Sequence, residues 1–293
     1  MPMRTPALSR SELPVAYRSA SDYSARAQRS ATRWLAAQLS LLGAGALIGG
    51  IDVELTNGFH IGALAAATSL TLAMVPTLFL IARNPQRAWY RGRAAAESLK
   101  TLAWKYAIRA IPFAEDIDAD GRFEDDAQTL RQELPEIPAA ADGTGITDAM
   151  RRLRGAELAV RRRVYLAERI DAESDWYTRK AEFNGRAARW WSIAAIAATL
   201  LGLGGGFLKA FGAVEYDGLG AASALAAAAT AWMQLKQFRP LAAAYSLTAN
   251  ELHVVRDKLS AVDEETLWAV TAASAEEAIS REHTMWIARR EVV

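Results

Sequence analysis

Four stretches of this chain contain no Asp, Glu, Lys or Arg, and they decide which class of protein it can form. The uncharged runs cover residues 34–51, 55–82, 190–208 and 218–235. Charged residues make up 23% of the chain, so paired uncharged runs of this length are rare by chance. An 18-residue helix is about 27 Å long, close to the hydrocarbon thickness of a bilayer. We therefore predict an all-α membrane protein with two transmembrane helical hairpins and long cytoplasmic helices.

The charges beside the runs predict their orientation. Short polar segments at 52–54 and 209–217 join the runs of each hairpin, and Lys209 is the one Lys or Arg in them. Lys and Arg instead flank the other ends of all four runs. Basic residues are retained on the cytoplasmic side, so both termini and the central segment are predicted to be cytoplasmic. The expected partner is the lipid bilayer, and the net charge of +1 gives no reason to expect nucleic acid.

The two hairpins form an internal repeat. "AQRSATRW" resembles "FNGRAARW" with an offset of 156 residues, which matches Trp34 with Trp190. After each second span, "AAAESLK" resembles "AAAYSLT" with an offset of 148. Both repeats run in, out and in, so their topology is parallel. The predicted organisation begins with a flexible N-terminus at 1–20. A first domain follows at 21–142, with spans at about 34–51 and 59–82. A second domain lies at 146–293, with spans at about 190–208 and 218–235, and the boundary is expected near Gly143.

The segments outside the runs are predicted to be helical. Thr147 can cap a long helix that begins at Asp148 and continues into the third run, interrupted at Gly155 and Gly185. Further helices are expected at 86–110, 124–134, 241–262 and 263–290.

Glycines four residues apart mark a close helix contact in each hairpin. Gly45 and Gly49 lie in the first run, and Gly202 and Gly206 lie at the corresponding place in the third. Glycines at this spacing share one helix face and let two backbones approach closely. The contact partner is either the other helix of the same hairpin or a second copy of the chain.

The polar residues of the runs favour a passive role. The runs carry no Asp, Glu, Lys or Arg, and His60 lies at an outer end, which argues against coupled transport and leaves a passive pore open. Ser and Thr there either line a polar path or bond back to their own helix. We interpret Trp34, Trp190, Trp191 and Trp232 as interfacial anchors. Without cysteine, and with three scattered histidines, the sequence predicts no catalytic residues, no metal, no cofactor and no enzyme.

Two motifs resemble a bacterial membrane family. "YLAERIDAESDWYTRKAEFNGRAARWW" and "EEAISREHTMW" are similar to the SLATT domains, which have two transmembrane helices, and "AWYRGRAAAESLKTLAWKYAIRAIPF" is similar to another SLATT subtype. The resemblance covers most of residues 20–290. It rests on Tyr165, Arg169, Trp176, Tyr177, Lys180, Ala181, Asn184, Glu277, Glu282, His283 and Trp286.

The resemblance implies a multi-pass effector of the bacterial inner (plasma) membrane, in conflict or defence systems that use nucleotide second messengers. It also implies homo-oligomers that perturb the membrane, with a cytoplasmic sensor protein as a candidate partner. The leading hypothesis is therefore a multimeric effector that forms or opens a passive pore. The alternative is a non-conducting scaffold that presents its cytoplasmic helices to a partner protein.

Overall fold

A computed structural model describes residues 8–49, 60–132, 145–214 and 218–291, with 281–291 as backbone. Every element with a described range is helical, in agreement with the predicted all-α class. The bounds are α1 Val15–Gly49, α2 Ile61–Arg83, α3 Pro85–Ala107, α4 Ala119–Gln132, α5 Asp148–Arg154, α6 Leu158–Tyr165, α7 Ala172–Ala210, α8 Gly218–Lys236, α9 Phe238–Ser260 and α10 Glu265–Glu291, with a 3₁₀ turn at Arg10–Glu12 and a π-helical segment at Leu166–Asp171.

The chain divides into two compact units, and each combines segments from both halves of the sequence. We call residues 1–28, 86–178 and 246–293 the polar unit, and residues 29–85 and 179–245 the apolar unit. Helices α1, α7 and α9 carry residues of both. The boundary expected near Gly143 lies outside the described residues, and the boundary expected at residue 20 falls inside α1.

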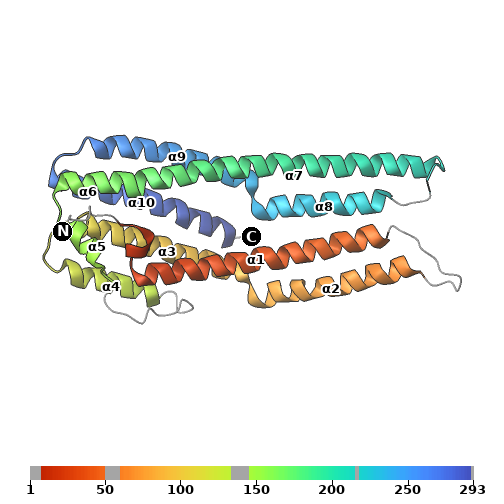
Figure 1. Ribbon diagram of the computed structural model, residues 1–293, viewed down its shortest axis with the longest axis horizontal. Helices are drawn as coiled ribbons and strands as arrows, with labels where there is room; N and C mark the ends of the chain where they lie inside the picture. The colour runs from red at the N-terminus through yellow and green to blue at the C-terminus, as the bar shows by residue number, and fades with distance from the viewer. Residues whose placement is uncertain (1–7, 50–59, 133–144, 215–217, 292–293) are drawn as a thin grey trace, which may run out of the picture. The chain divides into compact units, whose positions relative to one another are not determined.

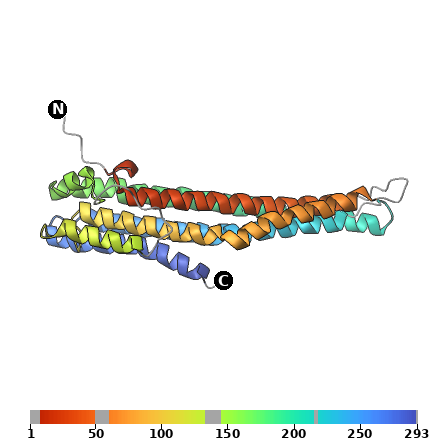
Figure 2. The same ribbon diagram turned by 90° about the horizontal axis from the view of Figure 1, so that it is seen from below.

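The apolar unit contains two helical hairpins. Helices α1 and α2 run antiparallel, and so do α7 and α8 (Figures 1 and 2). Its surface carries exposed apolar side chains: Leu201 and Ile81, for example, are 75% and 73% exposed. A folded protein in water rarely exposes a large apolar patch, whereas lipid tolerates one.

Two of the described helices are long and apolar enough to cross a membrane. They are Ile61–Arg83, with a mean hydropathy of 2.0, and Leu158–Ala210, with 1.7 over its most apolar window. The apolar part of α1 continues into residues outside the described ranges, and α8 is rich in alanine, which is only weakly hydrophobic. Two candidate spans are therefore present, and four spans remain a prediction.

A single left-handed residue ends the second helix of each hairpin. Asn84 follows α2 with φ of 36°, and Gln237 follows α8 with φ of 50°. The N–H of Asn84 donates to the carbonyl of Leu80, and the N–H of Gln237 donates to that of Met233. Residues other than glycine adopt this backbone conformation only at a cost of about 1 kcal/mol. Helices α3 and α9, each of 23 residues, begin directly after these two residues.

The breaks fix the register of the repeat. Asn84 and Gln237 are 153 residues apart, and at this offset every buried position of α9 matches a buried position of α3. Along residues 13–45 and the α6–α7 segment several buried positions coincide at 157, the offset that also matches Gly45 with Gly202. The matched buried pairs include Leu13 and Ile170, Ala20 and Tyr177, Ala31 and Ala188, Ala95 and Thr248, Leu99 and Leu252, and Tyr106 and Leu259.

This register corrects the offsets of 156 and 148 expected from local similarity. An offset of 148 places α9 five residues out of step with α3, which is more than one helical turn and turns buried positions toward solvent. Because the offset falls from 157 to 153 across the hairpin, the second hairpin is four residues shorter than the first. Helix α8 has 19 residues and α2 has 23.

The long helix expected from Asp148 has one of its two predicted interruptions. Thr147 caps α5, its hydroxyl accepting from the N–H of Met150, and Gly155 ends α5. Gly185 lies inside α7 without a break. The N-terminal segment expected to be flexible makes contacts from Leu8 on, where the Leu8 N–H donates to Glu168 at 2.6 Å.

Replacing Gly202 by Ala should destabilise the second hairpin, because a Cβ there would lie 2.8 Å from the Cβ of Ala222, which its own backbone holds in place. We expect a loss of about 1–3 kcal/mol in unfolding free energy, measured by near-UV circular dichroism in detergent. Gly204→Ala is the matched control, since nothing lies within 4 Å of its added Cβ. Equal effects of the two substitutions would contradict the close contact.

Candidate functional site

The helix pairs of the apolar unit meet through equivalent contacts in the two hairpins. Trp34 stacks on Phe79 with ring centroids 4.4 Å apart, and Trp191 lies 6.0 Å from Trp232. These pairs correspond at offsets of 157 and 153, so Trp191, not Trp190, is the structural counterpart of Trp34. Trp190 is 72% exposed.

The four predicted packing glycines face the other helix of their own hairpin. A Cβ on Gly45 would meet Ser69 at 3.4 Å, and one on Gly49 would meet Ala66 at 3.2 Å. In the second hairpin the nearest residues are Ala222 for Gly202 and Leu219 for Gly206. These neighbours again correspond at an offset of 153. The glycines therefore have intrachain partners in both hairpins.

Most hydroxyls on the apolar helices are satisfied by their own backbone. Thr68, Thr71, Thr199 and Thr230 each donate to the carbonyl four residues earlier, at 2.8–2.9 Å. The first hairpin also has two bonds between its helices: Ser69 Oγ donates to the carbonyl of Leu41 at 2.7 Å, and Gln38 Nε2 donates to Thr77 Oγ1 at 2.9 Å. A single chain therefore offers few unpaired hydroxyls for a polar path.

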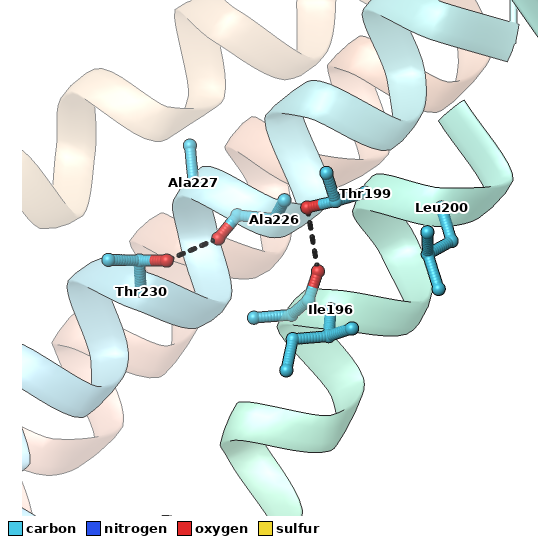
Figure 3. Close-up of a pocket in the computed structure, with 7 residues that line it drawn as sticks. Ile196, Thr199, Leu200, Ala226, Ala227 and Thr230 are labelled. Atoms are coloured by element: carbon cyan, nitrogen blue, oxygen red, sulfur yellow. Dashed lines mark hydrogen bonds between the residues drawn. The ribbon is translucent and has the colours of Figure 1, made fainter. Parts of the chain in front are cut away.

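A shallow groove of about 350 Å³ lies between α7 and α8, lined by apolar side chains and two threonines (Figure 3). Both threonine hydroxyls in it, Thr199 and Thr230, turn back to their own helices. Ala195 and Thr230 of the groove correspond to Gln38 and Thr77, which bond to each other in the first hairpin. An alanine thus lines the groove at the position where a glutamine bridges the first hairpin.

The polar unit contains a fully buried ion pair. Arg169, in the π-helical segment, donates to Glu276 of α10 through Nε at 2.9 Å and a terminal nitrogen at 2.8 Å, and neither side chain is exposed. Its other terminal nitrogen donates to Glu173 at 2.9 Å, and Glu173 also pairs with Lys100 of α3. One guanidinium thus joins three segments of the unit.

Glu276 has further donors on both oxygens. Tyr165 Oη donates to Oε1 at 2.9 Å, and Thr101 Oγ1 donates to Oε2 at 2.9 Å. Tyr165 also lies edge-on between Trp104 and Trp268, at 5.6 and 5.8 Å. The carboxylate is therefore surrounded by donors, and an aromatic cluster covers the network.

The electrostatics of this network follow from burial and pairing. Burial, followed by the charge of Glu276, raises the pKa of Tyr165 well above its usual value. For Arg169, burial alone would lower the pKa, but Glu276 and Glu173 raise it well above normal. Arg169 is therefore a permanent cation and Tyr165 a permanent hydrogen-bond donor. The cluster is suited to holding helices together.

Two more buried arginines close the turns of the polar unit. Arg154 donates to the carbonyls of Tyr106 and Phe113 at 3.0 and 2.7 Å, and Arg161 donates to that of Ile108 at 3.1 Å and pairs with Glu265. Burial, and then the hydrogen bond to Asp120, raises the pKa of Tyr106 to about 12.

The family-motif residues fall into three groups. Tyr165 and Arg169 form the buried network, and Tyr177 is buried beside Trp176, whose ring lies 5.3 Å from the guanidinium of Arg93. Asn184 Nδ2 donates to the carbonyl of Lys180 at 2.7 Å in the apolar unit. Three further motif residues, Glu282, His283 and Trp286, belong to α10, beyond its described side chains.

Sequence reasoning missed the main partner in this network. It selected Glu277, which lies on the outer face of α10 and pairs with Lys105 at 3.2 Å, and passed over its neighbour Glu276. It also missed Thr101, Lys100 and Glu173. The available signal was helical spacing: Trp268, Ala272, Ala275 and Ile279 share the buried face of α10 with Glu276, which makes that glutamate the inward one.

Among the residues that the structure describes, no three or more His, Asp or Glu side chains come together to hold a metal ion. The carboxylates of Glu173 and Glu276 are instead paired with Lys100 and Arg169.

Family models match both halves of the chain in tandem. Residues 14–162 match SMODS and SLOG-associating 2TM effector domain 3, and residues 165–286 match domain 1 of the same series. The chain belongs to the SLATT family. The match to domain 1 begins at Tyr165, the first residue of the buried network. Both matches describe domains with two transmembrane helices. No curated protein and no solved structure matches the chain.

Arg169→Met should strongly destabilise the polar unit, because it leaves Glu276 buried without its cation. We expect a loss of about 3–5 kcal/mol in unfolding free energy, whereas Arg169→Met combined with Glu276→Met should lose less than the single variant. Urea unfolding of the full chain in detergent, followed by circular dichroism, measures both. Additive losses in the double variant would show that the pair is not coupled.

Proposed function

We propose that this tandem SLATT chain is an inner-membrane effector that acts as a homo-oligomer and opens a passive pore in a bacterial conflict system. The observation that carries the proposal is the apolar unit. Its helices expose large aliphatic side chains such as Leu201 and Ile81, and Glu182 is the one carboxylate among its described residues. Such a surface is stable in lipid, and the effector role comes from the family description.

The hydrogen bonding of the polar groups supports the proposed oligomer. Since Thr68, Thr71, Thr199 and Thr230 bond to their own helices, one chain supplies little to replace the water around an ion. A conducting path therefore requires several chains or a rearranged hairpin. The described parts of the four uncharged runs contain no carboxylate, which favours passive conduction over coupled transport.

A non-conducting scaffold is the second candidate, and the outer face of α9 favours it. Leu247 and Val254, seven residues apart on one face, are 60% and 55% exposed in the polar unit. Exposed apolar residues at this spacing suit a helix or groove of another protein. In this alternative the hairpins only hold the polar unit at the membrane.

Induced expression in bacteria with a membrane-potential dye separates the two candidates. A pore depolarises the cells within the induction period, while a scaffold leaves the potential unchanged although the chain is found in the membrane fraction. Leu201→Arg is the control variant, because a charge on the lipid-facing side of α7 should reduce insertion and abolish depolarisation together. Depolarisation by a variant that is absent from the membrane would contradict the pore.

Reporter tags test the proposed orientation. Tags after Val293 and near Gly143 should report the cytoplasm, and tags at Asn57 or Val214 the opposite side, because the basic residues flank the other ends of the runs. A C-terminal tag outside the cytoplasm would reverse the orientation.

A further inference from the structure

Two cations flank the left-handed residue Gln237, and both contact hydroxyls instead of carboxylates. Lys236, the last residue of α8, donates from Nζ to Thr32 Oγ1 of α1 at 3.1 Å. Arg239, in the first turn of α9, donates to Ser192 Oγ of α7 at 3.1 Å. In the part of the chain that the structure describes, no carboxylate lies within ion-pair distance of either cation.

The ammonium group of Lys236 is partly removed from water. Its side chain is half-buried, and Nζ lies 4.9 Å from the centroid of the Trp232 ring. A hydroxyl and a ring face compensate a buried cation less well than an anion does. Arg239 is exposed, so the site is open to an incoming ligand on that side.

Neighbouring charges make the same region positive. Arg29 lies one turn before Thr32 on α1, and Arg189 lies one turn before Ser192 on α7, so each shares a helix face with its hydroxyl residue. Glu182 is the one carboxylate among the described residues of the apolar unit. The field at the site therefore favours an anion.

We propose that Lys236 and Arg239, positioned by Thr32 and Ser192, bind the phosphate headgroup of an anionic phospholipid. This rests on the membrane placement proposed above. Trp232, one turn before Lys236, pairs with Trp191, and tryptophan rings at span ends lie at the headgroup level. A cation one turn farther along reaches the lipid phosphates, where basic pockets between membrane helices bind acidic headgroups.

The repeat shows that this site is particular to the second hairpin. At the structural register, Arg83, Gln86 and Leu35 take the places of Lys236, Arg239 and Ser192. The equivalent positions of the first hairpin thus lack the second cation and its hydroxyl partner, and the nearest cation is Arg87, one residue farther along α3. We therefore assign one strong lipid site to each chain.

Native mass spectrometry of the full chain in detergent tests the proposal, with phosphatidylglycerol and phosphatidylcholine as probes. The parent should retain one phosphatidylglycerol in preference to phosphatidylcholine. Lys236→Gln and Arg239→Gln should each weaken retention about five-fold, the effect of one cation near a lipid surface. Glutamine removes the positive charge and keeps a polar amide. Arg179→Gln is the control: it removes the same charge about 20 Å farther along α7, beyond the screening distance.

Equal retention of the two lipids would overturn the proposal, and so would an equal loss with Arg179→Gln, which would indicate general surface charge. Displacement of the lipid by millimolar inorganic phosphate would show a site for free anions. If Lys236→Gln does not fold, Arg239→Gln, at an exposed position, decides the outcome. A chain missing from the membrane fraction of cells contradicts the proposed function separately, because lipid retention is measured in detergent.

Discussion

The polar unit depends on neutralising one carboxylate that has no access to water. Glu276 accepts from Arg169, Tyr165 and Thr101, so the π-helical segment, α6, α3 and α10 all converge on its two oxygens. A buried ion pair contributes little net stability, but removing one partner is costly. The pair therefore acts mainly on specificity: other packings of these helices leave a buried charge without its partner. The π-helical turn that carries Arg169 is an irregularity often found at functional positions.

The described helices of the apolar unit are held together by close packing and not by ion pairs. Small residues bring α1 onto α2 and α7 onto α8, and aromatic pairs close the same end of each hairpin. In lipid, helices gain little from burying apolar surface, so close packing and interhelical hydrogen bonds decide which faces meet. The first hairpin has two such bonds, from Ser69 and Gln38, and their counterparts Ala222 and Ala195 have none to give.

Much of the fold was predictable because charge and helix patterns are local. The four uncharged runs fall within α1, α2, α7 and α8 wherever they are described, and the cap at Thr147 forms as expected. The repeat register was not predictable, because alanine-rich strings match at several offsets, and only burial and the left-handed residues select 153. The sequence-based choice of Glu277 instead of Glu276 was wrong for a related reason. Adjacent glutamates look alike in sequence, and the helix face that packs inward distinguishes them.

The exchange of Gln38 for Ala195 has a consequence for symmetry. The two hairpins of one chain share a backbone plan but present unlike surfaces, one bridged by an amide and one grooved. Copies arranged around a closed ring would place bridged and grooved hairpins in alternation, with twice as many hairpins as chains. Neighbouring positions in such a ring would be chemically distinct although built from a single gene product, which is a form of asymmetry that an assembly of single-hairpin chains does not have.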